Sequence, residues 1–278
     1  MSHRIAWLRA LVAAAACLGV LPPATAGEPR KPSNQALNDL NLEVEALQTL
    51  HALQATRAQM QKLRRLAKET ADKPPAREAA KVSDRFRKTI TDLRDALVAN
   101  RDEERINQLN DKLEQLRDKE QPELDDDIDI TDAARDEVPG VLRALTPAQV
   151  AGYLGANADT IPDPLGRIEE ALGKVRGMKE KEWKETRDQV GEDVGQLLAG
   201  LDMDKAEQVK ADVGQLLIVA RGLKDEDFKK ERPGLLKKAR RIVGDLGPID
   251  VLRHVMERHL AELLSNPRLG AALDARLK

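Results

Sequence analysis

The chain has 278 residues, a formal net charge of −2 at pH 7, 34% charged residues and only 2% aromatic residues. This charge balance lacks the basic footprint that binding to DNA or RNA needs. The scarcity of aromatic residues disfavours a β-sandwich or barrel, and abundant Ala, Leu, Glu, Lys and Arg favour helices, so the sequence predicts an all-α fold.

Residues 1–26 have the features of a secretory signal peptide. Arg4 and Arg9 precede an apolar run at 10–21, and Ala-Thr-Ala at 24–26 supplies the small residues that a signal peptidase accepts. We expect cleavage near Ala26 and an extracytoplasmic, periplasmic product.

The only cysteine, Cys17, lies inside this predicted signal peptide. Lipid attachment at Cys17 is the alternative to cleavage after residue 26. It is disfavoured because Ala14 stands where a lipoprotein motif usually has Leu. No later segment has an apolar run long enough to cross a bilayer, so no transmembrane segment is expected in the mature chain.

Residues 27–34 are expected to form a disordered tail, followed by a helical hairpin or coiled-coil-like module at 35–121. Apolar residues recur at helical spacing from Leu37 to Ala67, which predicts one amphipathic helix to about position 71. The stripes of these N-terminal helices would also allow copies of the chain to join as a homo-oligomer.

A second helical segment of this module begins near residue 82. Its apolar stripe changes register between Leu97 and Ile106, which are nine residues or about 180° apart on a helix. Asn100 suits a left-handed helix end and Asp102 suits an N-cap. The sequence therefore predicts a break or sharp kink between these two stripes.

The acidic residues at 122–130 predict a linker, with a helical repeat-like domain following at 131–278. Asp125, Asp127 and Asp129 have the first spacings of a calcium loop. However, Ile130 stands where that loop needs Gly, and Asp136 stands where it needs Glu. The sequence favours a solvated acidic linker.

Two similar stretches, RGMKEKEWKETR at 176–187 and RGLKDEDFKKER at 221–232, lie 45 residues apart. Each predicts a helix, an Arg-Gly turn with Gly at the helix C-terminus, and a second helix that begins with acids. Duplicated hairpins of this length resemble solenoid repeats, so an array of helical hairpins is expected.

A hexapeptide, DVGQLL, also occurs twice, at 193–198 and 212–217. These copies do not align at the 45-residue offset. Gly195 and Gly214 are both predicted to let helices approach closely.

The repeated stretches contain four candidate interaction residues. Trp183 and Phe228 are the first large apolar residues of their helices, and Arg176 and Arg221 precede the turn glycines. The aromatic pair could form twin ligand-contact sites or wedge between helices. The sequence favours the second interpretation, because large apolar side chains usually lie in the core.

The sequence contains no pattern typical of a catalytic, metal or cofactor site. His254 and His259 are five residues apart, whereas zinc-binding helices use a spacing of four with Glu after the first His. No phosphate-binding glycine loop or Gly-x-Ser-x-Gly elbow occurs. The basic run at 229–241 could contact an anionic cell-wall polymer or lipid head group, or form the solvated face of a helix, which the sequence favours.

LTPAQ at 145–149 predicts a helix start, with Thr146 as N-cap, Pro147 at the first helical position and Gln149 completing a capping box. The same five residues resemble the LTxxQ motif of Spy/CpxP-like periplasmic helical proteins. Thr56 and Gln59 keep the Thr-x-x-Gln part. The resemblance implies an ATP-independent chaperone or an envelope-stress sensor.

These features predict an exported, non-enzymatic interaction or scaffold protein of the cell envelope, with one or more protein partners and no cofactor. The alternative is a chaperone-like binder of unfolded clients or a stress sensor. A third hypothesis, less favoured, is an enzyme whose site has no sequence signature.

Overall fold

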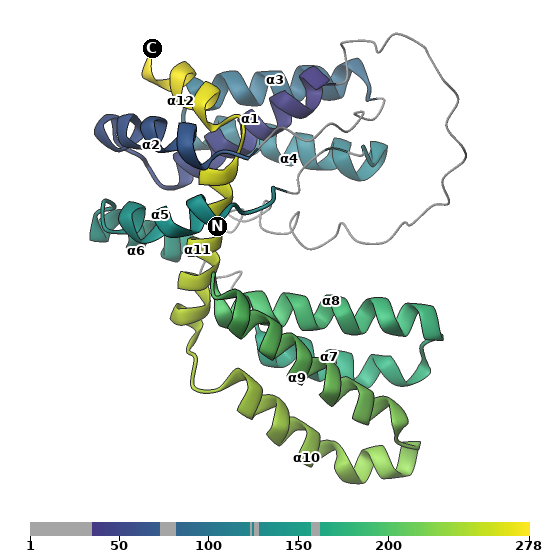
Figure 1. Cartoon of the computed structure of the whole chain (residues 1–278). Coiled ribbons are helices and arrows are strands. Elements are labelled where there is room, and N and C mark those ends of the chain that lie inside the picture. The colour runs from purple at the N-terminus through teal and green to yellow at the C-terminus, as the bar shows by residue number, and fades with distance from the viewer. Residues whose placement is uncertain (1–34, 73–81, 123, 125–127, 157–161) are drawn as a thin grey trace, which may run out of the picture. The chain divides into compact units, whose positions relative to one another are not determined.

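The computed structural model describes residues 35–72, 82–122, 124, 128–156 and 162–278. Within these ranges it has twelve α-helices and no strand, which confirms the predicted all-α class (Figure 1). No helix in these ranges is both long enough and apolar enough to cross a membrane. The predicted signal peptide and tail, and residues 123 and 125–127 of the acidic segment, lie outside the described residues.

The chain forms two compact units, which we call unit 1 (residues up to 156 together with 260–278) and unit 2 (157–259). Unit 1 contains α1 (Gln35–Ala52), α2 (Arg57–Thr70), α3 (Asp84–Val98), α4 (Glu103–Glu120), α5 (Asp132–Leu142), α6 (Pro147–Ala156) and α12 (Leu269–Leu277). Unit 2 contains α7 (Pro164–Lys174), the 3₁₀ turn η3 (Val175–Gly177), α8 (Glu180–Ala199), α9 (Met203–Gly222) and α10 (Asp225–Val243). The chain passes from unit 2 back to unit 1 within α11 (Pro248–Ser265).

The units do not follow the predicted boundary at 122–130, because hydrogen bonds tie the segment after it into unit 1. The backbone N–H of Thr131 donates to Ser265 Oγ at 3.0 Å, and the Thr131 hydroxyl donates to the carbonyl of Thr70 at 2.8 Å. The Thr70 hydroxyl donates in turn to the carbonyl of Leu264 at 2.7 Å. Helices α5 and α6 therefore belong with the N-terminal helices, and the division comes after residue 156.

The single helix predicted from 35 to 71 is two helices in the structure. The break lies at Gln54, which has the left-handed φ of 48°, and Thr56 caps α2. The apolar stripe runs on across the break, since Leu53 and Met60 are both buried. Hydrophobic periodicity alone therefore did not reveal it.

Helix α1 is enclosed within unit 1, where it packs against α3 and α12. Every residue from 37 to 53 is buried or half-buried. Its apolar stripe is thus used inside the unit, and pairing of copies through the N-terminal helices stays a prediction.

The break predicted between the two out-of-register stripes is confirmed. Helix α3 ends at Val98, Asn100 has a φ of 48°, and the Asp102 side chain accepts a hydrogen bond from the backbone N–H of Arg105 at 2.9 Å. Residues of both stripes, including Leu97 and Ile106, are buried. The turn lets α3 and α4 pack against each other as a hairpin.

The two helical hairpins that the repeat predicted, α7–α8 and α9–α10, are present in unit 2, where they close on each other. Along the chain α7 packs against α8, α8 against α9 and α9 against α10, and α10 then packs back against α7 (Figure 1). The equivalent positions of the two repeats point into one core, among them Ile168 with Val213 and Leu172 with Leu217, all nearly inaccessible to solvent. Two repeats are thus enough to form a hydrophobic core, because each buries the apolar face of the other.

The glycines that cap helices with a positive φ in unit 2 are not the predicted ones. Gly177 and Gly222 are the last residues of η3 and α9, and neither has a positive φ. Gly200 and Gly244 have φ of 61° and 68° and form the C-caps of α8 and α10. Each repeat therefore uses its left-handed glycine at the end of its second helix.

Candidate functional site

The four candidate interaction residues come together in unit 2, but crosswise between the repeats. The Arg176 guanidinium lies over the ring of Phe228 at 4.4 Å and forms an ion pair with Asp225. The Arg221 guanidinium lies over the ring of Trp183 at 4.9 Å and forms an ion pair with Glu180 at 2.9 Å. Each arginine therefore covers the aromatic ring and pairs with the N-terminal acid of the other repeat.

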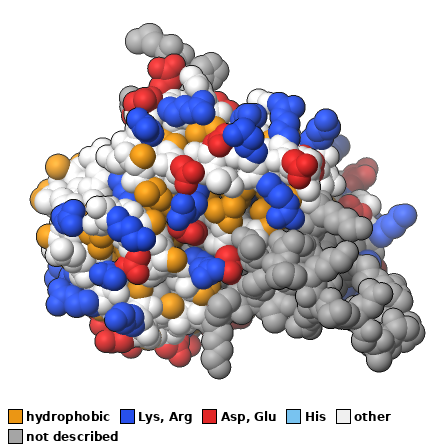
Figure 2. Space-filling model, turned by 90° about the horizontal axis from the view of Figure 1, so that it is seen from above, with side chains coloured by type: hydrophobic (Ala, Val, Ile, Leu, Met, Phe, Trp, Pro, Cys, Tyr) orange, Lys and Arg blue, Asp and Glu red, His pale blue; other side chains and the backbone are white. Residues whose placement is uncertain are grey.

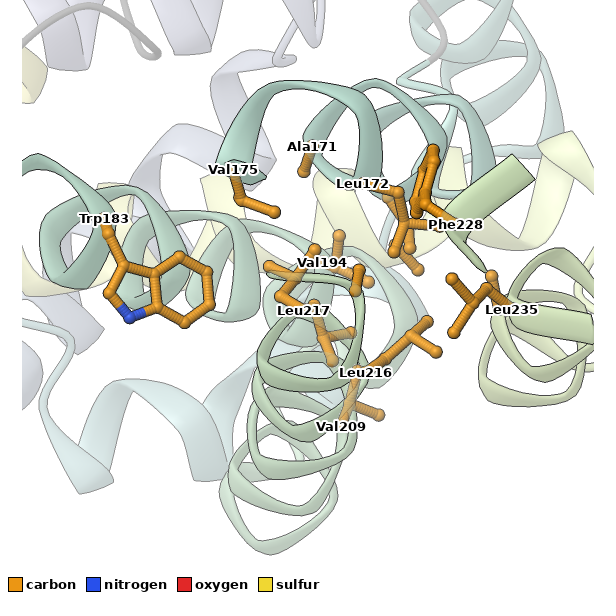
Figure 3. Packing of buried hydrophobic residues seen from close by; sticks show 14 of the residues in the cluster. Ala171, Leu172, Val175, Trp183, Val194, Val209, Leu216, Leu217, Phe228 and Leu235 are labelled. Atoms are coloured by element: carbon orange, nitrogen blue, oxygen red, sulfur yellow. The ribbon is translucent and has the colours of Figure 1, made fainter. Parts of the chain in front are cut away.

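This arrangement assigns the four residues to packing. Trp183 and Phe228 are buried members of the unit 2 core, at separate edges of the cluster in Figure 3. Their exposed edges are covered by arginines of the same chain, with Arg187 a second cation 5.8 Å from the Trp183 ring. The structure thus favours the wedge interpretation over twin ligand-contact sites.

The crosswise contacts predict crosswise energetic coupling. In double-mutant cycles, Arg176→Gln combined with Phe228→Leu is expected to show a coupling of about 0.5–2 kcal/mol, because the guanidinium is largely shielded from water. Arg176→Gln combined with Trp183→Leu serves as the matched control within one repeat and should show coupling near zero. Urea unfolding of the three single variants, the two double variants and the wild type measures both coupling energies. Equal coupling in the two cycles would contradict the crosswise arrangement.

Unit 1 contains a second paired feature, built from two capping boxes. The side chain of Gln59 accepts from the backbone N–H of Thr56 at 2.8 Å, and that of Gln149 accepts from Thr146 at 2.9 Å. The hydroxyl of each threonine accepts in return from the backbone N–H of its glutamine. The predicted cap at Thr146 is confirmed, and the Thr-x-x-Gln sequence at 56–59 forms the same structure.

The two glutamines also hydrogen-bond each other, which no sequence pattern indicated. The amide nitrogen of each lies 2.9 Å from the side-chain oxygen of the other. Gln59 further donates to the carbonyl of Ala144 at 2.8 Å, and Gln149 to that of Leu53 at 3.0 Å. The starts of α2 and α6 are thereby joined, beside a small apolar hollow lined partly by Leu63.

A polar group with a perturbed pKa lies at the end of α1. Burial lowers the pKa of the half-buried His51 imidazole, and the guanidinium of Arg276 lowers it further. A hydrogen bond with Asn100 and the carboxylate of Glu103 oppose these effects but do not outweigh them. The folded state therefore favours neutral His51.

The lowered pKa predicts that acid weakens unit 1. A histidine whose folded pKa is below its unfolded value of about 6.5 stabilises the fold above that pH and loses this contribution as the pH falls. We expect the hydrogen-exchange protection factors of α1 and α12, corrected for the intrinsic exchange rate at each pH, to decrease from about pH 6.5 downward, and His51→Gln to reduce this dependence. An unchanged pH profile in the variant would exclude His51 as the cause.

The structure gives His254 a structural contact. Its Nδ1 lies 3.0 Å from the carbonyl oxygen of Leu197, and its ring packs against Gly200 at the turn after α8. Among the described residues no group of three or more His, Cys, Asp or Glu side chains is placed to hold a metal ion. The calcium alternative at Asp125 and Asp127 concerns residues outside the described part.

The outer surface contains the remaining candidates. Among the described residues four large hydrophobic side chains are exposed, namely Met203, Ile218, Val219 and Ile249. Ile218 and Val219 lie in the segment 213–220 of α9, which has no charged residue. Helix α10 presents the basic run at 229–241, and the apolar residues Phe228, Leu235 and Ala239 of this helix face the core.

No protein-family model matches the chain, and no curated protein or solved structure matches it either. The candidate sites are therefore defined by geometry alone. Two are internal contacts, namely the crosswise arginines of unit 2 and the paired glutamines of unit 1. Two are outer surfaces, on α9 and on α10.

The crosswise pairing had a signal in the sequence that could have been used. Each Arg-Gly turn is followed by an acid and then an aromatic residue at the same spacing. The arginine of one repeat can therefore pair with the acid and aromatic residue of either repeat. Periodicity showed that the unit is duplicated. Which turn pairs with which depends on the packing of α10 against α7, which is a long-range contact.

Proposed function

We propose that this chain is an exported, non-enzymatic interaction or scaffold protein of the cell envelope, which binds a protein partner through its helical exterior. The observation that carries the proposal is the division between core and surface. The apolar stripes of the helices are buried. Among the described residues, Ile218 and Val219 on α9 are the only exposed large hydrophobic side chains without a charged residue next to them in the sequence.

The exterior elsewhere is charged. On the face that Figure 2 shows, Lys and Arg side chains predominate, Asp and Glu side chains lie among them, and hydrophobic side chains reach the surface in areas between them. A surface of this kind suits a defined contact with one partner, because binding of unfolded clients needs a broad exposed apolar area.

The partner can be tested by photo-crosslinking in the native host. A photoreactive residue at position 218 is expected to capture one dominant envelope protein, whereas the same residue at the exposed polar position Gln115 of α4 should capture little. Capture of many unrelated exported proteins at position 218, increasing after heat stress, would instead support a chaperone.

The chaperone or stress-sensor alternative follows from the resemblance of residues 145–149 to the LTxxQ motif. In the structure Thr146 and Gln149 form the N-cap of α6, and Gln149 also hydrogen-bonds Gln59, so both residues have a structural role. We expect the purified protein not to suppress aggregation of a denatured client enzyme at equimolar ratio. Suppression would make the chaperone the preferred function.

The proposed export predicts that the signal peptide is cleaved, which can be tested separately. Because signal peptidases need small residues at the cleavage site, Ala26→Arg is expected to leave most of the protein as uncleaved precursor. Cys17→Ala is the matched control and should be processed normally, giving a product that begins at Gly27. Accumulation of precursor in the Cys17→Ala variant would instead show lipoprotein processing, and N-terminal sequencing of the product distinguishes the two.

A further inference from the structure

Helix α10 carries a concentrated positive surface. Residues 229–241 include seven basic side chains and one acid, Glu231, in a chain whose net charge is −2. The other acids of the helix gather in its first turn, at 225–227. The positive charge therefore extends over about 18 Å of the helix, at 1.5 Å per residue.

Six of these cations point away from the core of unit 2 and are exposed, namely Lys229, Lys230, Lys237, Lys238, Arg240 and Arg241. Ideal helix geometry spreads them over an arc of about 180° on the side opposite the buried face. We call this surface the basic face of α10. The seventh cation, Arg232, is directed toward α7, where it pairs with Glu169 at 3.1 Å.

The positive charges of the basic face are not neutralised by acidic residues of the described part of the chain. None of its six side chains forms an ion pair or hydrogen bond with another residue of the described part of the chain. Some other exposed cations of unit 2 do have partners, as Lys174 has in Glu170 and Lys181 in Glu185. Repulsion among six unpaired cations costs free energy in the absence of a partner, and an anionic partner would remove that cost.

The composition of the face indicates which partner. Protein interfaces are depleted of lysine at their centres and enriched in aromatic residues and methionine, none of which lies on the basic face. Clusters of four to eight Lys and Arg on one helix are typical of surfaces that bind anionic lipid head groups. The apolar side of α10 is already buried in unit 2, so this helix has no free apolar face to insert into a bilayer.

We infer that the basic face of α10 is a docking surface for an anionic phospholipid membrane, which it binds by electrostatic contact with the head groups and without insertion. The inference stands on the charges of α10 and does not require the proposed scaffold role. It would hold the protein at a membrane surface while α9 remains available to a protein partner.

Vesicle co-sedimentation tests the inference with the chain from Gly27, which keeps every described helix and lacks the apolar run at 10–21. The protein is expected to bind vesicles of phosphatidylglycerol and phosphatidylcholine at low salt, not to bind phosphatidylcholine alone, and to dissociate at high salt. Replacing Lys229, Lys230, Lys237 and Lys238 by Gln should weaken binding by about tenfold or more. Arg240 and Arg241 are retained because they also stabilise the helix C-terminus.

The matched control removes four exposed cations from unit 1, namely Arg65, Lys68, Arg101 and Arg105, also by substitution with Gln. It has the same net charge as the α10 variant and should bind anionic vesicles within about twofold of the wild type. Circular dichroism confirms that both variants are folded. Absent binding to anionic vesicles, or equal loss in both variants, would overturn the inference. Binding to polyglutamate without binding to vesicles would overturn it in favour of an acidic protein partner.

Discussion

Replacing Gly195 by alanine is expected to destabilise unit 2 by about 1–3 kcal/mol, the usual cost of overpacking. A Cβ at this position would lie 2.7 Å from the carbonyl oxygen of Ala206, on the facing helix α9. Because that atom belongs to the backbone, a side-chain rotation cannot relieve the clash, and α8 and α9 must separate. The gain of up to about 1 kcal/mol from the higher helix propensity of alanine does not compensate.

The chain provides the matched control in its second copy of the same hexapeptide. Gly214 has the same sequence neighbours as Gly195, but the nearest atoms to its added Cβ are those of the Arg187 side chain at 3.9 Å. Gly214→Ala should therefore stabilise unit 2 by up to about 1 kcal/mol. Trp183 is the only tryptophan after residue 26 and lies in the unit 2 core, so its fluorescence during urea unfolding reports both effects. Changes of the same sign in the two variants would contradict the close approach at Gly195.

The two glycines also show what sequence reasoning can and cannot establish. Both were predicted to allow close helix approach because they occur in the same local sequence, and the structure contradicts the prediction for Gly214. The missed residue is Gly191, whose added Cβ would lie 3.1 Å from the carbonyl oxygen of Lys210. The two glycines four residues apart on α8, Gly191 and Gly195, are a signal for close packing, whereas the hexapeptide repeat was not.

Two helix boundaries were predicted correctly because they depend on residues within a few positions. The break between α3 and α4 follows from Asn100 and Asp102, and the start of α6 follows from Thr146 and its neighbours. The break at Gln54 was missed because its left-handed backbone is held by a residue 95 positions away. The carbonyl of Gln54 accepts a hydrogen bond from Gln149 at 3.0 Å.

The division into units was missed for the same reason. The acidic run near residue 125 has the composition of a linker, but the position of a boundary depends on which helices share a core. Leu269 and Leu273 of α12 are completely buried in unit 1, although they are the last large apolar residues of the chain before its final turn. Nothing in their local pattern indicates that α12 packs against α1 and α2.

The glutamine pair in unit 1 supplies the second large expected effect. Replacing Gln149 by alanine is expected to destabilise unit 1 by about 3 kcal/mol, because it leaves the carbonyls of Leu53 and Gln54 without this donor and removes the cap bond to Thr146. Gln149 is 9% exposed, so water cannot easily replace the lost partner. Gln108→Ala, at an exposed position of α4, is the control and should change stability by less than about 0.5 kcal/mol.

A double-mutant cycle separates the energy of the Gln59–Gln149 contact from that of the hydrogen bonds that each glutamine makes with the backbone. Gln59→Ala alone should cost less than Gln149→Ala, because Gln59 donates to one backbone carbonyl, that of Ala144. The double variant is expected to lose at least about 1 kcal/mol less than the sum of the single variants, since either substitution alone already breaks the amide–amide contact. Hydrogen exchange of the first turns of α2 and α6 provides the measurement. Strict additivity would mean that the two amides act independently, and that the starts of α2 and α6 are held together by the backbone contacts alone.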